Sequence, residues 1–194
     1  MKKIVACDFD GTLTTRDTFV AFIRDVFGDR KFWWGFLRHT LLLVKMFLGL
    51  CPGGEVKERI FAYFFKGMSL DEFDSHCQQF AASHRSLLRP LGIAAITQAQ
   101  QEGAEVVIIS ASIDNWVQPF FPNVRVIGTK VEVKDGCLTG RFLSSNCFGQ
   151  EKVNRLLTVY PQRSDYHLTA YGDSKGDREL LAFADESYYK PFRR

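Results

Sequence analysis

The segment from Ile4 to Thr12 restricts the fold of this chain more than any other part of the sequence. Its first four residues, Ile4–Cys7, are apolar, and such a short run is typical of a strand that is buried on both faces. The run gives way at once to the acidic and turn-forming residues of DFDGT (8–12). A buried strand that leads directly into a polar loop indicates an α/β sheet, in which ligands bind beyond the carboxyl ends of the strands.

Two further predicted strands end in the same way. The strand EVVIIS (105–110) leads into Ala111 and Ser112, and the strand from Tyr166 to Gly172 leads into GDSKGD (172–177). Strands that alternate with helices predict a Rossmann-like, three-layer, mostly parallel sheet. The other predicted elements are helices at about 90–103, 149–160 and 176–184, strands at 125–133 and 137–142 around the turn Asp135-Gly136, and a last strand at 187–189.

The residues from about Asp17 to Leu88 follow a helical pattern and contain no strand signal. Breaks that contain glycine divide this segment into three or four helices, and Ser69 with Glu72 forms a capping box at the start of one of them. We therefore expect an all-helical cap inserted into the α/β chain. The predicted domains are a Rossmann-like core of residues 1–16 and 89–194, and a cap of residues 17–88.

The polar strand ends are expected to meet in one crevice, because parallel strands end at the same edge of a sheet. Several carboxylates in one crevice repel each other unless a cation lies among them, and oxygen ligands without paired His or Cys favour Mg²⁺ over zinc. A carboxylate beside such an ion can attack phosphorus, and a second one, two residues along, can act as acid and base. Ser110, Lys152 and the backbone amides of the first loop can neutralise phosphoryl charge.

Each of these residues has an ordinary structural explanation when it is taken alone. Asp10-Gly11 is a common turn, and Ser110 is an ordinary strand end. Lys152 would be a solvated helix residue and Asp173 a helix cap. Their occurrence in this order, each at the end of a strand or helix, favours one shared site.

In motif order and spacing, the chain resembles the haloacid dehalogenase (HAD) superfamily of phosphatases. The motifs are DFDGTLT (8–14), IISAS (108–112), GQEK (149–152) and GDSKGD (172–177). The phosphoserine-phosphatase-like subgroup, which has a helical cap between its first two motifs, is the most similar, and the segment VIGTKVEVKDGCLTGRF (126–142) resembles it in detail. The resemblance covers nearly the whole chain and is least specific in the cap.

The resemblance implies a role for each motif residue. Asp8 would be the nucleophile and a metal ligand, and Asp10 would be the general acid and base, with its backbone carbonyl on the metal. Asp173 would complete the Mg²⁺ site. The expected phosphate-binding residues are Ser110, Lys152, Thr12 and Gly11, and the expected supporting residues are Asp177, beside the metal or Lys152, and Ser112.

The sequence departs from the subgroup pattern at two places. Phosphoserine phosphatases usually carry GDGxND where this chain has GDSKGD (172–177). They also place a glutamate nine residues after the nucleophile to hold the substrate amino group, and here the shorter Asp17 stands at that position. Asp17 is expected either to contact the substrate or, as we favour, to cap the following helix.

Composition limits the functional classes and the location. The 25 basic residues against 22 acidic ones give a net charge of +3, which is too small to indicate a nucleic-acid partner. The five cysteines form no CxxC pair and are odd in number, which favours a reduced, cytoplasmic protein over a disulfide scaffold. The start MKKIVACDFDGT is too short and too polar for a signal peptide.

The stretch FWWGFLRHTLLLVKMFLGL (32–50) is apolar but carries charges. On one helix, Lys31, Arg38 and Lys45 would form a single stripe, and burying each charge in a bilayer costs roughly 2.5–3.5 kcal/mol, so we disfavour a transmembrane helix. The favoured prediction is a cap helix buried on several faces, whose charges, Arg38 among them, extend to solvent or face the active site. The alternatives are an interfacial helix on anionic lipid, with its tryptophans at the headgroups, and a homodimer interface.

These features together predict a Mg²⁺-dependent phosphomonoester hydrolase that forms a phospho-aspartate and acts on a small phosphorylated metabolite. One alternative is a phospholipid-phosphate phosphatase with a membrane-facing cap, similar to phosphatidylglycerophosphatases of the same subgroup. An alternative from another class is a non-catalytic phosphate-binding or phospho-aspartate switch module. The expected partner is thus a phosphorylated small molecule or a lipid headgroup, and the expected location is the cytoplasm or the inner face of a membrane, with peripheral contact through residues 32–50.

Overall fold

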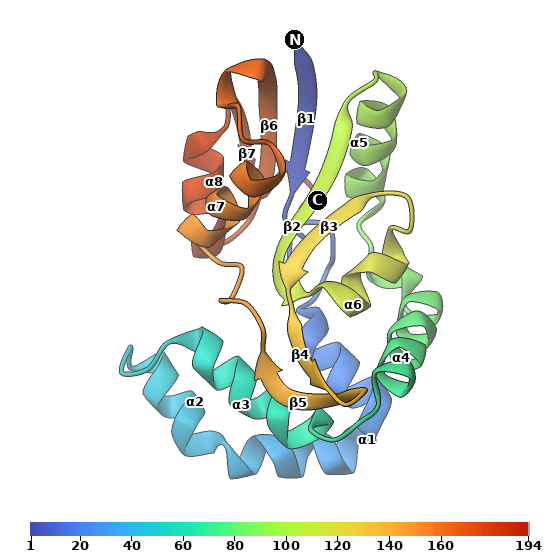
Figure 1. Cartoon of the computed structure of the whole chain (residues 1–194), viewed down its shortest axis with the longest axis vertical. Coiled ribbons are helices and arrows are strands. Elements are labelled where there is room, and N and C mark those ends of the chain that lie inside the picture. The colour runs from blue at the N-terminus through green and yellow to red at the C-terminus, as the bar shows by residue number, and fades with distance from the viewer. Residues whose placement is uncertain (194) are drawn as a thin grey trace.

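Five parallel strands form the central sheet in the computed structural model, which describes residues 1–193. The strand order is β3-β2-β1-β6-β7, so the first strand of the chain lies at the centre (Figure 1). Every neighbouring pair is parallel, which confirms the prediction of a mostly parallel sheet. The strands are β1 (Lys2–Cys7), β2 (Glu105–Ile113), β3 (Arg125–Thr129), β6 (Tyr166–Gly172) and β7 (Glu186–Tyr189).

Helices cover both faces of this sheet and make it the middle of three layers (Figure 1). The helices of the core are α5 (Pro90–Gln101), α6 (Asp114–Val117), α7 (Gln150–Val159) and α8 (Arg178–Phe183), with 3₁₀ turns at Arg85–Leu87, Gln118–Phe120, Arg163–Asp165 and Lys175–Asp177. Side chains of β1 alternate between the two faces. Ile4 and Ala6 are buried with α7 and α8, whereas Val5 and Cys7 are buried with α5 and the cap.

The predictions did not include α6, which is a single turn directly after β2. A helix this short is too brief to produce a periodic pattern in the sequence. It nevertheless carries the buried Trp116, whose Nε1–H donates to the hydroxyl of Thr18 at 3.1 Å. Because Thr18 begins the first cap helix, this bond fixes the cap to the core beside the carboxyl end of the sheet.

Four helices and an aromatic core form the cap. They are α1 (Thr18–Arg38), α2 (Thr40–Phe47), α3 (Gly53–Phe65) and α4 (Leu70–Ser83), which agrees with the predicted number. One of the predicted glycine-containing breaks, that at Gly28, is a kink inside α1, where this residue has a φ of 72°. Of the capping box predicted for Ser69 and Glu72, the structure gives one half, in which the Ser69 hydroxyl accepts from the N–H of Glu72 at 3.2 Å. Phenylalanine rings fill the interior, and Phe22 lies 5.5 Å from Phe65 in a stacked pair.

A β-hairpin formed by β4 (Val131–Lys134) and β5 (Cys137–Phe142) completes the cap. Its turn, Asp135-Gly136, has positive φ at both residues, as the sequence predicts for a tight hairpin. Backbone hydrogen bonds join the hairpin to residues 67–70, and β5 packs against α3. The predicted boundaries place residues 131–142 in the core, whereas the hairpin contacts the cap helices (Figure 1).

The stretch Phe32–Leu50 is not one helix, and the favoured prediction of a helix buried on several faces is wrong. The chain turns at His39, so α1 ends and α2 begins within this stretch, and the expected single stripe of cations is interrupted. No residue of α2 is fully buried, because only one side of it packs against the rest of the cap. Among residues 1–193, no helix combines the length and the apolar character that a membrane crossing requires.

Candidate active site

The carboxyl ends of β1, β2 and β6 meet at a cavity of about 280 Å³ that lies between the sheet and the cap. Residues from all three strand ends, from α7 and from α3 line it. The predicted site residues that line this cavity are Asp8, Asp10, Gly11, Asp17, Ser110, Lys152 and Asp173.

Asp8 and Lys152 form the buried centre of the site. The N–H of Asp8 donates to the carbonyl oxygen of Tyr171 at 2.9 Å, which extends the pairing of β1 with β6 and fixes the Asp8 backbone. Lys152 lies in the first turn of α7, just after Gly149, and is only 2% exposed. Its Nζ donates to one oxygen of Asp8 and to one oxygen of Asp177, each at 2.6 Å.

Burial and charge act in opposite directions on these two groups. Burial raises the pKa of Asp8 to about 7, although the ammonium of Lys152 acts to lower it. Burial also acts to lower the pKa of Lys152, but the charges of Asp8 and Asp177 outweigh this effect and raise it. Lys152 is therefore a fixed cation, and Asp8 needs additional positive charge nearby to be fully ionised at neutral pH.

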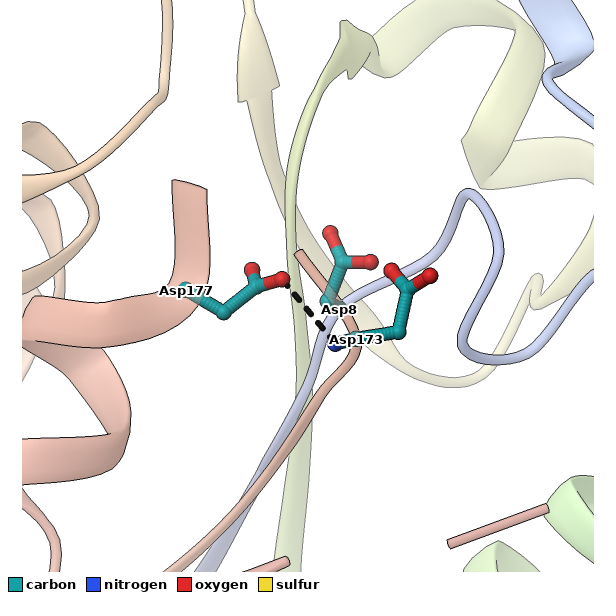
Figure 2. Close-up of side chains that lie close together, drawn as sticks. All are labelled: Asp8, Asp173 and Asp177. Atoms are coloured by element: carbon teal, nitrogen blue, oxygen red, sulfur yellow. Dashed lines mark hydrogen bonds between the residues drawn. The ribbon is translucent and has the colours of Figure 1, made fainter. Parts of the chain in front are cut away.

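Asp177 positions Lys152 and the loop after β6. Its second oxygen accepts from the N–H of Asp173 at 3.1 Å (Figure 2) and from the N–H and the hydroxyl of Ser174, each at 2.9 Å. Burial alone would raise the pKa of Asp177, but Lys152 and these hydrogen bonds lower it overall. Both of its oxygens are therefore already bonded, one to Lys152 and the other to the loop after β6.

The acidic residues provide a set of ligands that fits Mg²⁺. Oxygen atoms of Asp8, Asp173 and Asp177 lie within 4.8 Å of one another, and all three residues are buried (Figure 2). Hard oxygen donors without His or Cys suit this ion, and a nearby cation would oppose the effect of burial, which raises the pKa of Asp8. Asp8 and Asp173 are the two residues best placed to hold an ion, because both line the cavity and Asp177 is not among its lining residues.

The loop after β1 approaches Asp173 closely. The hydroxyl of Thr12 lies 3.3 Å from one oxygen of Asp173 and 3.0 Å from one oxygen of Asp8, so this buried side chain links two carboxylates. Gly11 has a φ of +80°, and a Cβ at this position would lie 2.5 Å from the other oxygen of Asp173. Only glycine fits here, for both backbone and steric reasons. Arg193, near the end of the chain, forms an ion pair with the same carboxylate.

Asp10 is held by a separate set of partners. The N–H of Thr18 donates to one of its oxygens at 2.7 Å, and the hydroxyl of Ser112 donates to the other. Burial, followed by the charge of Asp17, raises the pKa of Asp10, and the two hydrogen bonds and Lys57 only partly oppose this. A carboxyl with a raised pKa is suited to giving and taking a proton near neutral pH.

The two serines at the end of β2 have different positions. Ser110 lines the cavity, and its hydroxyl accepts from the N–H of Ser112 at 3.0 Å. Ser112 is buried behind it and contacts Asp10, so its predicted supporting role corresponds to orienting this carboxyl.

Asp17 and Arg38, the two cap residues for which substrate contact was one of the expected alternatives, lie at opposite ends of α1. The side chain of Asp17 accepts from the N–H groups of Phe19 and Val20, so it caps the helix, and it also lines the cavity. Arg38 is exposed and is not among the residues lining this cavity. The whole of α1, which is kinked at Gly28, separates the two residues, and this explains why one end reaches the site and the other does not.

Lys57 is a site residue that the sequence predictions did not include. It lies on α3, lines the cavity, and its Nζ donates to the carbonyl oxygen of Ala111 at 2.8 Å. Burial lowers its pKa, and the charge of Asp10 opposes that effect. A signal was present in the sequence, because Lys57 precedes the buried Ile60, Phe61 and Phe64 at helical spacing and so lies on the inward face of α3.

A second cavity of about 830 Å³ adjoins the first. Phe148 lines both cavities, and half of this residue is exposed. The remaining walls of the second cavity come from residues 52–55, from Glu58 and Arg59 of α3, from Phe142 at the end of β5 and from residues 144–146. A ligand in the small cavity could therefore extend past Phe148 along the edge of the cap.

Two comparisons of the sequence with known proteins agree. A sequence model described as haloacid dehalogenase-like hydrolase matches residues 5–182. Protein CicA of Caulobacter vibrioides is 39% identical over 197 residues, which cover 98% of this chain and 86% of that protein.

Solved structures share the fold at low sequence identity. A protein with unknown function from Bordetella pertussis has a TM-score of 0.83 at 19% identity, with 96% of this chain and 89% of that chain covered. A substrate-bound phosphoserine phosphatase has a TM-score of 0.63 at 16% identity, with 97% and 86% covered. These likenesses confirm the predicted fold class.

Proposed function

The chain belongs to the haloacid dehalogenase-like hydrolase family, which confirms the predicted enzyme class, and from this premise we propose that it is a Mg²⁺-dependent phosphomonoesterase that forms a phospho-aspartate on Asp8. One observation carries the proposal. A buried lysine, Lys152, holds Asp8 at 2.6 Å, and a second carboxyl with a raised pKa, Asp10, lies two residues further along the same loop.

In the first step, a carboxylate oxygen of Asp8 attacks phosphorus, and the bond from phosphorus to the leaving oxygen breaks. Asp10 gives its proton to that oxygen, which is a role that its raised pKa favours. Lys152 and Ser110 neutralise the phosphoryl oxygens and hold them in place. Asp8 and Asp173, with the backbone carbonyl of Asp10, would hold Mg²⁺, which supplies positive charge to the phosphoryl group and to Asp8 when it is bound.

In the second step, a water molecule attacks phosphorus and the bond between phosphorus and Asp8 breaks. Asp10, now ionised, takes the proton of this water, so inorganic phosphate leaves and Asp8 returns to its starting state. The hydroxyl of Ser112 and the N–H of Thr18 keep the Asp10 carboxyl in one orientation through both steps. The cap covers the cavity and limits the access of bulk water.

The preferred substrate is a small phosphorylated metabolite. A cavity of about 280 Å³ accommodates a phosphoryl group and a compact leaving group, but little more. Lys57 and Asp17 line this cavity and offer one cation and one anion to polar groups of the leaving group. We therefore expect Lys57→Met to raise KM for the physiological substrate much more than KM for a neutral aryl phosphate.

A phospholipid monoester is the second candidate substrate, and the adjoining cavity of about 830 Å³ favours it. A longer leaving group could pass Phe148 and lie against residues 52–55, next to the end of α2. Phosphate release from phosphoserine and from a phospholipid monoester, each with Mg²⁺ and with a chelator, separates the two candidates.

The direct test is the release of phosphate from a generic aryl phosphate. The wild-type protein should be active with Mg²⁺, and Asp8→Asn should lose several orders of magnitude in kcat, as removal of a nucleophile does in other enzymes. Asp165→Asn is the matched control, because Asp165 is an exposed aspartate on a 3₁₀ turn of the core. Equal activity of the wild type and Asp8→Asn would refute the proposal, and no phosphate release by either protein would favour a non-catalytic phosphate-binding module.

A further inference from the structure

The second half of α1 and all of α2 expose an apolar surface that the fold does not cover. Its large side chains are between 46% and 85% exposed. These helices lie along the end of the molecule opposite the N-terminus, on the outer side of the cap (Figure 1). We call this set the apolar cap surface, and it consists of Trp33, Trp34, Leu37, Leu41, Val44, Phe47, Leu48 and Leu50.

The inner sides of the two helices are already packed, so these exposed residues do not belong to an incomplete core. Gly35 of α1 lies so close to α3 that a Cβ there would be 2.3 Å from the ring of Phe64. On α2, Leu42, Leu43 and Met46 pack against the main hydrophobic cluster. Each helix therefore has one apolar side in the cap and a second apolar side in solvent. Large apolar side chains gathered in solvent on neighbouring helices indicate an interaction site.

Cations accompany this surface, and acids do not. Arg30, Lys31, Arg38 and Lys45 are all exposed, and no Asp or Glu occurs from residue 30 to residue 54. A hollow of about 850 Å³ between Arg30, Lys31 and the two tryptophans offers room for a group that these side chains could surround. No acidic residue lies among these four cations in the sequence, so they give this surface a strong local positive charge in a chain whose net charge is only +3.

The charge pattern favours an anionic partner over a second copy of this chain as the occupant of this surface. In a two-fold dimer built through it, the four cations of one copy would face the same four cations of the other, which opposes association. An anionic partner would instead be attracted. Exposed Trp, Phe and Leu interspersed with Lys and Arg are the composition of helices that lie in a membrane interface, with the rings at the headgroups and the cations on anionic lipids.

We propose that the apolar cap surface docks the protein on the surface of an anionic lipid bilayer, with α1 and α2 lying in the interface and no segment crossing it. The short, interrupted helices suit this position, because neither has to span the hydrocarbon. In this orientation the sheet points away from the bilayer (Figure 1).

Tryptophan fluorescence provides the first test. The chain has three tryptophans, and Trp116 is fully buried in the core, so contact with lipid should change only the signals of Trp33 and Trp34. The probe is a vesicle of equal parts phosphatidylcholine and phosphatidylglycerol whose acyl chains are brominated. We expect quenching on vesicle addition, and in Trp33→Phe/Trp34→Phe we expect unchanged co-sedimentation but no quenching.

Substitutions that remove apolar or basic side chains provide the second test. Trp34→Ser/Leu37→Ser and Arg38→Glu/Lys45→Glu should each lower partitioning to the mixed vesicles by at least about tenfold. Leu91→Ser, and Lys3→Glu/Lys190→Glu with the same change in charge, alter exposed residues of the core and should bind as the wild type does. Aryl phosphate hydrolysis should be unchanged in all four variants, which verifies that they are folded.

Three results would overturn the proposal. The first is the absence of co-sedimentation with the mixed vesicles at low ionic strength. The second is equal binding to vesicles of phosphatidylcholine alone, because the four cations would then contribute nothing. The third is a stable dimer in analytical ultracentrifugation that Trp34→Ser/Leu37→Ser dissociates and that vesicles do not, since a second copy would then be the occupant.

Discussion

The Nζ of Lys152 donates to a carboxylate oxygen of Asp8 at 2.6 Å, although 144 positions separate the two residues in the chain. Both side chains are almost completely buried. Removing a carboxylate and an ammonium from water is costly, and well-packed apolar residues often stabilise a protein as much or more. The contact is therefore better explained by the chemistry of the site than by the stability of the fold.

Loss of the lysine should damage both activity and stability. Lys152→Met leaves Asp8 and Asp177 buried without a cation, and we expect the free energy of unfolding to fall by about 3–5 kcal/mol. In the background of Asp8→Asn the same substitution should cost less, because one uncompensated charge is then absent. Urea denaturation of the four proteins measures this coupling, and strictly additive effects would contradict the ion pair.

The raised pKa of Asp8 predicts a dependence of stability on pH when no divalent cation is present. The folded state holds this proton more tightly than the unfolded chain, in which the pKa is about 4, so the contribution of Asp8 is complete below that pH. It is lost as pH rises through about 7. In a chelator, the unfolding free energy of the wild type should therefore fall relative to Asp8→Asn between these values. If the unfolding free energy of the wild type instead rose relative to that of Asp8→Asn as pH increased, the raised pKa of Asp8 would be contradicted.

Gly11 should be required for the site and not only for the turn. Gly11→Ala places a Cβ against Asp173 and strains the backbone, whereas Gly67→Ala, at a φ of +86°, meets nothing within 4 Å. Both substitutions should cost roughly 1–2 kcal/mol of stability through strain. Only Gly11→Ala should also weaken Mg²⁺ binding and phosphate release. Equal activity of the two variants would show that the close approach to Asp173 is unimportant.

Thiol reactivity should report the burial of the cysteines. Cys7, Cys77 and Cys147 are buried, and burial raises the pKa of each, that of Cys147 to about 11, so their reactive thiolates are scarce near neutral pH. Cys51 and Cys137 are partly exposed. Alkylation followed by mass spectrometry should label only these two in the native protein and all five after unfolding. Rapid labelling of Cys7 would contradict its position in the packed sheet.

Much of the core was predictable because strand and loop are adjacent in the sequence. Ile4–Cys7 has the pattern of a buried strand, so the carboxylates that follow it were expected at its carboxyl end. Lys152 was also predictable, because GQEK lies at the start of α7 and matches a family motif. In these cases local pattern and tertiary position agree.

The remaining features of the site and the cap depend on contacts between distant segments, which a local sequence pattern does not predict. Lys57 enters the site because α3 lies across the strand ends, and Arg193 reaches Asp173 only through the path of the last residues. Neither glycine nor proline occurs at the turn at His39, so the local sequence does not predict it. The turn allows Leu42, Leu43 and Met46 to pack against the rest of the cap. The same turn leaves the other sides of α1 and α2 exposed.

The measurement that tests the central claim most directly is the trapping of the phosphorylated enzyme. An aryl phosphate with a good leaving group needs little help from an acid, so in Asp10→Asn the first step should proceed while the hydrolysis of the intermediate is slowed. After an acid quench, we predict the mass of one phosphoryl group on the peptide that contains Asp8, and none in Asp8→Asn/Asp10→Asn. Phosphate on another residue, or continued turnover of the Asp8→Asn single variant, would contradict the account.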